Sequence, residues 1–303
     1  LNGDYLSNMR DCNSNRSYYT DVQYQLTTSR YVGTQYLLQL NQSQEFIIHD
    51  DRLRGIFYGG YLSNSDVTAS ADGTIEGRGV YLGFYETIRY KGLNYNTYVS
   101  GSHGNHEFDF DILDGLTPDR IKTKGDYGYY AAYAGASVSG EVKVIDTTLT
   151  PRLSMDTAYA ESDEVNVDFT ARQKNIEQSG NLMLDQLNGS RLTAETVFHY
   201  PTTFRQWDIT AEITPRFFCQ QDVGEIEETC GIGNKLLFQG INNKYGNFDF
   251  GLDFENVDGI RRESYEVSHS INIIENLSLS SNYSFDESLQ PSYKFGFEYS
   301  IDF

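Results

Sequence analysis

One short segment, residues 102–107, carries residue types that could do chemistry. Its histidines, His103 and His106, could bind a metal ion, and Ser102 with His103 could supply the nucleophile and the base of a hydrolase. Residues an odd number of positions apart on a β-strand point to opposite faces of the sheet. Neither pair can therefore act together while the strand continues, and no Gly-x-Ser-x-Gly pattern is present. We expect a polar strand end here, with no catalytic residue and no metal site.

The three cysteines suggest a disulfide. Cys219 and Cys230 flank a short acidic segment, and their spacing matches no zinc motif. We expect these two residues to form a disulfide that closes a loop, which implies an oxidising compartment. Cys12 is then left free or paired outside this chain.

Composition narrows the class of protein. Aromatic residues make up 14% of the 303 residues, yet the mean hydropathy is −0.51. A disordered chain lacks aromatic residues, and a helical membrane protein needs runs of about 18 or more apolar residues, which are absent here. A transmembrane β-barrel combines both properties, because each strand has one lipid-facing and one water-facing side. The net charge of −20 argues against a nucleic-acid partner.

The elements that position these residues are amphipathic strands. Apolar and polar residues alternate with a period of two from one end of the chain to the other, whereas few windows show a helical period. We expect about 14 strands, each close to the roughly 9–11 residues that cross a membrane. The clearest alternating segments are Tyr18–Thr28, Val32–Leu40, Gly55–Leu62, Gly79–Ile88, Leu93–Gly101, Tyr127–Val138, Leu149–Tyr159, Leu192–Tyr200, Trp207–Phe217, Phe248–Phe254, Tyr265–Ile273, Leu277–Phe285 and Tyr293–Phe303.

The connections between these segments are expected to alternate in length, with long ones outside the cell and short ones in the periplasm. Residues 164–186 could form a long loop or one more hairpin. Counting back from a periplasmic C-terminus, the expected outside connections are Asp286–Pro291, Asn256–Arg262, Cys219–Ile232, Asp109–Lys124 and Asn64–Glu76. The expected short turns are Glu275–Asn276, Asn242–Tyr245 and Tyr200–Arg205.

Closure makes the last strand special. Hydrocarbon offers no partner to an unpaired backbone group, so a spanning sheet must close on itself. We therefore expect Tyr293–Phe303 to pair with the first strand, near Tyr18–Thr28. The last strand also resembles the C-terminal strand of bacterial outer-membrane barrels, which the barrel-assembly machinery recognises. The residues that occupy this assembly pattern are Lys294, Gly296, Tyr299, Ile301 and Phe303.

The order of the motifs resembles the translocator domain of autotransporters over most of residues 53–160 and 262–303. The barrel of that family has 12 strands with a helix through its pore, whereas residues 1–16 here show no clear helical pattern. The segments that carry the resemblance are Gly55–Ser63, Gly79–Tyr85, Leu93–Phe110, Leu149–Tyr159 and Asn276–Tyr283.

Charged residues on the polar faces of the strands are expected to point into a lumen. They could line a hydrated path or contact a threaded segment, or they could form a lattice of salt bridges that fills the lumen. Arg152 and Arg216 are candidate partners for them. The expected lumen-facing residues are Asp208, Glu212, Asp249, Asp253, Glu255, Lys294, Glu298 and Asp302.

The sequence thus predicts an all-β protein, a transmembrane antiparallel up-and-down barrel of 12–14 strands over residues 17–303. Residues 1–16 would be the remnant of a passenger or linker, or a segment in the lumen.

The resemblance implies a non-enzymatic barrel, without cofactor, that anchors an N-terminal passenger and helps to export it. The expected location is the outer membrane of a Gram-negative bacterium, with loops at the cell surface and a periplasmic C-terminus. Expected partners are outer-membrane lipid and lipopolysaccharide, the barrel-assembly machinery and the passenger. The alternative is a porin-like or structural barrel without a passenger.

Overall fold

The computed structural model describes residues 18–29, 33–49, 51–67, 71–113, 120–171, 176–182, 186–221, 228–242, 244–274, 277–286 and 291–301. Antiparallel strands account for nearly all of these residues. Among them, no helix is long and apolar enough to cross a membrane.

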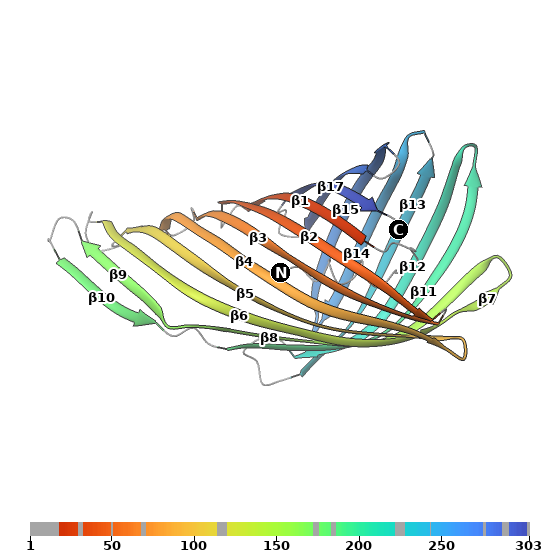
Figure 1. The fold of residues 1–303 in the computed structure, drawn as a ribbon, viewed down its shortest axis with the longest axis horizontal. Helices are drawn as coiled ribbons and strands as arrows, with labels where there is room; N and C mark the ends of the chain where they lie inside the picture. The colour runs from red at the N-terminus through yellow and green to blue at the C-terminus, as the bar shows by residue number, and fades with distance from the viewer. Residues whose placement is uncertain are drawn as a thin grey trace.

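Fourteen strands form one closed barrel, which confirms the fold class (Figure 1). Successive barrel strands pair with each other, and β1 and β17 close the barrel by pairing over residues 18–27 and 292–301. The count from the alternating segments is therefore right, and the 12 strands of the resembled family are not found. The barrel strands are β1 (Tyr18–Ser29), β2 (Gly33–His49), β3 (Arg52–Val67), β4 (Ala71–Tyr90), β5 (Leu93–Leu113), β6 (Arg120–Gly140), β8 (Thr147–Ser162), β11 (Leu187–Phe204), β12 (Trp207–Gln221), β13 (Glu228–Asn242), β14 (Gly246–Val257), β15 (Ile260–Ile274), β16 (Leu277–Asp286) and β17 (Pro291–Ile301).

Three further strands extend this barrel. The short β7 (Val142–Val144) pairs with the start of β8. A hairpin of β9 (Val165–Ala171) and β10 (Ile176–Leu182) occupies the stretch that the sequence left open between loop and hairpin. Its register continues that of β8 with β11, and β9 also pairs with the outer part of β6. The hairpin and β7 project from opposite ends of the barrel (Figure 1).

Both chain ends of the described barrel lie at the same end of the sheet, because Tyr18 is paired with Ile301. Short turns gather at this end, among them Lys91–Gly92 and Arg205–Gln206. Strands β4, β5 and β6 have 20, 21 and 21 residues, about twice the roughly 9–11 residues that cross a membrane. One side of the barrel therefore rises well beyond the opposite side, on which β16 and β17 have 10 and 11 residues.

Several connections are shorter than expected, because the strands run on into them. Asn256–Arg262 was expected to be an outside connection, but the structure has a two-residue turn at Asp258–Gly259, with φ of 49° and 84°. An Asp-Gly pair with positive φ is the signal of a tight hairpin, and it outweighs the polarity of the flanking residues. The strands likewise extend to Val67 and Leu113, inside two other expected loops. The turn expected at residues 200–205 begins only at Arg205, after the end of β11.

The two faces of the sheet differ in how exposed their side chains are. Large apolar side chains are exposed on one face, which is the reverse of the arrangement in a soluble protein. On β4, Val80, Leu82 and Phe84 are 62%, 49% and 50% exposed, whereas the alternate residues Tyr81 and Tyr85 are only 8% and 9% exposed. The side chains of the buried set reach strands two positions away, since the Tyr85 hydroxyl donates to Glu45 on β2. Such contacts need a concave surface, so this set defines the inner face of the barrel and the apolar set its outer face.

The barrel is a shell rather than a packed globule. Its accessible surface is 19071 Å², compared with roughly 13,000 Å² for a compact protein of its mass. Inner-face residues such as Asp208, Lys235 and Asn247 are exposed. Solvent-accessible surface therefore exists on both faces of the sheet, as an open lumen requires.

Aromatic side chains on the inner face lie over glycines of the neighbouring strand. A Cβ atom at Gly83 would overlap the ring of Phe57, whereas one at Gly101, on the outer face, meets only the Ala131 carbonyl at 3.8 Å. We predict that Gly83→Val lowers the free energy of unfolding by about 1–3 kcal/mol, the usual cost of overpacking. The matched control, Gly101→Val, should leave it unchanged or slightly raised, because Val favours strands. Urea unfolding of the barrel in lipid vesicles measures both variants, and equal midpoints would contradict the assignment of faces.

Candidate functional site

The inner face divides into two walls of different chemistry. We call the inner residues of β3–β6 the aromatic wall and the inner residues of β8–β15 the charged wall. The aromatic wall contains the buried cluster of Phe57, Tyr81 and Tyr85, with Leu53 and Tyr98 packed against it. The charged wall contains the ion pairs described below. A lumen between these walls is the candidate functional site.

Tyrosine hydroxyls fasten the aromatic wall to its neighbours on both sides. The Tyr85 hydroxyl donates to Glu45 Oε1 at 2.6 Å, and the Tyr98 hydroxyl donates to Asp156 Oδ1 at 2.7 Å. Farther from the chain ends, His106 stacks on Tyr129 with 5.0 Å between ring centroids. The rings lie close to the sheet because Gly55 and Gly83 leave room for Tyr85 and Phe57. The aromatic wall is therefore thin, with polar groups at its margins.

Arginines organise the charged wall. The Arg216 guanidinium donates to Asp253 and, at 2.8 Å, to Glu255 Oε1, and its side chain is only 10% exposed. Arg191 also donates to Glu255, and its guanidinium lies 3.8 Å from the centre of the Phe218 ring. This cluster joins β11 to β14 across two intervening strands, so we name it the arginine cluster.

A second pair lies nearby on β8 and β11. Arg152 Nη1 is 3.2 Å from Glu195 Oε1, and the two side chains are 18% and 13% exposed. Both residues lie on the inner face, opposite each other in the register of the two strands. Each basic group in this pair and in the arginine cluster is matched by an acidic one, so the paired charges roughly cancel.

Other expected lumen residues have polar rather than basic neighbours. Glu212 Oε1 is 2.9 Å from His199 Nδ1, and Asp249 Oδ2 accepts a hydrogen bond from the Ser268 hydroxyl at 2.9 Å. Asp208 is exposed beside the Arg205–Gln206 turn. That all these carboxylates line a hydrated lumen stays a prediction.

On the last strand, the register gives the positions of two residues that were expected in the lumen. Lys294 lies opposite Asn282 and Gln25, and Glu298 lies opposite Ser278 and Asp21. Asp302 lies outside the described residues. Its inward placement and those of Lys294 and Glu298 remain predictions.

The proposed assembly residues share this strand. Gly296 is buried, and Tyr299 and Ile301 pair with Thr20 and Tyr18 of β1. Phe303 lies outside the described residues. The role of this set in assembly, like that of Lys294, remains a prediction.

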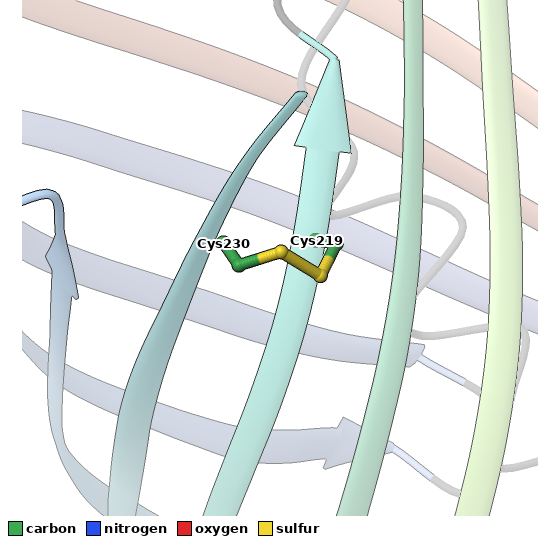
Figure 2. Close-up of a disulfide and its surroundings, with 2 residues drawn as sticks. All are labelled: Cys219 and Cys230. Carbon is green, nitrogen blue, oxygen red and sulfur yellow. A yellow bond between two sulfur atoms is a disulfide. The ribbon is translucent and has the colours of Figure 1, made fainter. Parts of the chain in front are cut away.

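The expected disulfide is present, bonding Cys219 to Cys230 (Figure 2). The two residues face each other directly in the register of β12 and β13, so the bond links two adjacent strands. It therefore closes the hairpin whose connection is residues 222–227, which lie outside the described residues, as does Cys12.

The serine and histidines lie as strand geometry requires. Ser102 is buried on the inner face, and His103 is exposed on the outer face. His106 lies on the inner face against Tyr127 and Tyr129. The prediction that neighbouring members of this segment point apart is therefore confirmed. The expected strand end is wrong, because β5 continues through this segment as far as Leu113.

Sequence reasoning missed several members of the charged wall. Arg191, Glu195 and His199 share one face of β11. Arg191 lies one residue before the expected segment Leu192–Tyr200, and Glu195 and His199 lie inside that segment but were not assigned to the lumen. Glu266 was missed because its strand was read from its apolar positions alone. Once the register between the strands is known, the odd or even position of each of these residues places it on the inner face.

We predict that Arg216→Met destabilises the barrel strongly, because it leaves Asp253 and Glu255 with one guanidinium between them in a half-buried site. Breaking a buried ion pair costs about 3–5 kcal/mol, whereas replacing both partners is often neutral. Adding Glu255→Gln to Arg216→Met should therefore recover part of the loss. Urea unfolding in lipid vesicles measures both variants. The control is Arg78→Met, which removes an exposed pair with 3.9 Å between Arg78 Nη2 and Glu107 Oε1 and should have little effect. Equal effects of the Arg216 and Arg78 variants would rule out a structural role for the arginine cluster.

The comparisons with known proteins identify the fold. No protein-family model matches the sequence, and no curated protein matches it either. The translocator domain of the autotransporter NalP from Neisseria meningitidis is 12% identical with a TM-score of 0.54, over 98% of this chain and 93% of that one. The CymD monoaromatic hydrocarbon channel is 10% identical with a TM-score of 0.53, over 99% and 93%. The toluene transporter TbuX from Ralstonia pickettii is 8% identical with a TM-score of 0.50, over 94% and 90%. At such low identity the likeness concerns the fold alone, and that fold is a closed antiparallel β-barrel.

Proposed function

We propose that this chain is an integral outer-membrane barrel whose wet lumen carries material across the membrane. The single observation that supports this most is the inversion of its faces. Large apolar side chains such as Val80, Leu82 and Ile232 are exposed on the outer face, whereas the inner face holds the ion pairs of Arg152 and Arg216. A barrel in lipid needs this arrangement, because the outside meets hydrocarbon and the inside meets water.

The long side of the barrel supports an orientation. On β4–β6 the apolar outer face gives way to charged residues beyond Val80, where the Lys124 amine lies 2.8 Å from Asp109. At the opposite end, Trp207 stacks on Tyr245 with 6.4 Å between ring centroids, as expected of aromatic residues at a membrane interface. Long strands and projecting hairpins are usual on the extracellular side and short turns on the periplasmic side. We therefore propose that both ends of the barrel domain lie in the periplasm.

We propose that the cargo is an N-terminal passenger, as in autotransporters. The order of sequence motifs and the fold shared with the NalP translocator domain support this. The start of β1 lies at the proposed periplasmic end, so a passenger on the cell surface would be joined to it through the lumen. Folding and the burial of the apolar outer face against lipid would supply the energy. We further propose that the last strand is read by the barrel-assembly machinery.

Conduction of small solutes is the second candidate function. Two observations favour it, namely the closure of the barrel with 14 strands rather than 12 and the fold shared with a monoaromatic hydrocarbon channel. A porin-like barrel needs no passenger, and barrel diameter grows with strand number.

A fusion distinguishes the two candidates. An epitope placed before Leu1, behind a secretion signal in a Gram-negative host, should become accessible to protease on intact cells if the barrel exports its passenger. A matched epitope in the Lys91–Gly92 turn should stay protected, because that turn is proposed to be periplasmic. The barrel itself should migrate faster on a gel when unheated than when boiled. A folded barrel whose N-terminal epitope stays protected would contradict passenger export and leave the solute pore.

A further inference from the structure

We propose that the lumen is selective for cations. This inference rests on the proposed function, because it needs a water-filled barrel. It follows from the balance of charges on the inner face. Rings or rows of carboxylates in a pore attract cations and exclude anions.

The paired groups contribute little to this balance. In the arginine cluster, Arg191 and Arg216 face Asp253 and Glu255, and elsewhere Arg152 faces Glu195. Each of these sets has as many basic as acidic groups. Selectivity must therefore come from the remaining inner-face charges.

The remaining charges are mainly acidic. On the described side chains of β12–β15, the inner face outside the arginine cluster carries the acids Asp208, Glu212, Asp249 and Glu266 and the bases Lys235 and Arg262. The described inner side chains of β4–β6 add one further base, Arg89, next to a turn. At the margins of the aromatic wall, two more carboxylates, Glu45 and Asp156, accept hydrogen bonds from tyrosines. Among the inner side chains that the structure describes, acidic groups therefore exceed basic ones.

Three of these acids make their hydrogen-bonding contacts with groups other than Lys or Arg. Asp249 accepts a hydrogen bond from the Ser268 hydroxyl, Glu266 accepts one from the Asn282 amide, and Glu212 contacts His199, which is charged only when protonated. In the part of the chain that the structure describes, none of the three forms an ion pair with Lys or Arg. In a water-filled lumen, mobile cations would therefore neutralise these three acids.

Asp249 and Glu266 also lie close together. Asp249 is opposite Ser268, and Glu266 is opposite Gly251, so the two acids are diagonal neighbours on β14 and β15. Adjacent like charges of this kind concentrate the negative potential on one part of the wall. In 0.1 M salt this field spans a distance of about 10 Å, and in 1 M salt only about 3 Å. Selectivity should therefore fall as the salt concentration rises.

The test is the reversal potential of the purified barrel in a planar lipid bilayer, with a tenfold KCl gradient at pH 8. We expect the sign of a cation-selective pore, with K⁺ several times more permeant than Cl⁻. Glu212→Gln, Asp249→Asn and Glu266→Gln together should reduce the reversal potential by at least half. Raising the salt on both sides should reduce the reversal potential of the unmodified barrel as well.

The matched control removes the same charges from the outer face. Glu76, Glu107 and Asp126 lie in one exposed row across β4, β5 and β6. Glu76→Gln, Glu107→Gln and Asp126→Asn together should leave the reversal potential unchanged. A decrease equal to that of the inner triple variant would overturn the assignment of the selectivity to the lumen.

The outcomes separate this inference from the proposed function. A folded barrel that carries no current would contradict an open lumen and so the pore itself. A barrel that conducts without preference, or prefers Cl⁻, would overturn cation selectivity and leave the pore intact. A gel shift on boiling confirms folding of each variant. If the triple variant does not fold, Asp249→Asn alone should still lower the selectivity, and no change there would count against the proposal.

Discussion

Every other feature of this protein depends on the closure of its sheet. A backbone N–H or C=O group in hydrocarbon has no water to bond with, so a spanning sheet tolerates no open edge. The pairing of β1 with β17 over ten successive residue pairs removes the edges that a flat sheet would leave. Once the sheet is closed, each side chain must point either to lipid or to the lumen. The alternation of apolar and polar residues in the sequence then indicates which side chains face lipid and which face the lumen.

The inner face shows how a barrel of this size holds its shape without a packed core. The aromatic wall uses large rings over glycines, so the strands approach each other closely and bulky groups lie flat. The charged wall uses arginines that reach across several strands, as Arg191 does from β11 to Glu255 on β14. The rings join adjacent strands, whereas the tyrosine hydroxyls and the arginines link strands that are not neighbours in the ladder.

Much of this fold could be predicted from the sequence. In a long aromatic-rich chain, the strict period of two in segments such as Phe248–Phe254 indicates amphipathic strands of a barrel. Closure between the first and last strands followed from hydrogen bonding alone. Strand ends were predicted poorly, because polar segments such as Asn64–Glu76 look like loops when the sheet in fact continues beyond the apolar belt. The Asp258–Gly259 turn was hidden by polar neighbours, although its dipeptide is a hairpin signal.

The candidate site was predictable only in part. Period-two patterns give the face of each residue, and so they singled out Asp253 and Glu255 with Arg216 as a possible partner. They do not give the register between strands, which decides that Arg216 lies opposite Gly233 and beside Glu255. Arg191 and Glu266 could be assigned to the inner face only with that register. Partners across two or three strands depend on curvature, which no local pattern contains.

The central claim is that the outer face of this barrel meets lipid and the inner face meets water. Single cysteines at successive positions 79–84 of β4, introduced after the native cysteines are replaced by serine, test it most directly. Each would carry a small fluorescent label in vesicles that contain brominated lipid. Quenching should be strong at positions 80, 82 and 84 and weak at the positions between them. Uniform quenching, or the opposite alternation, would contradict a barrel with an apolar outside and a wet inside.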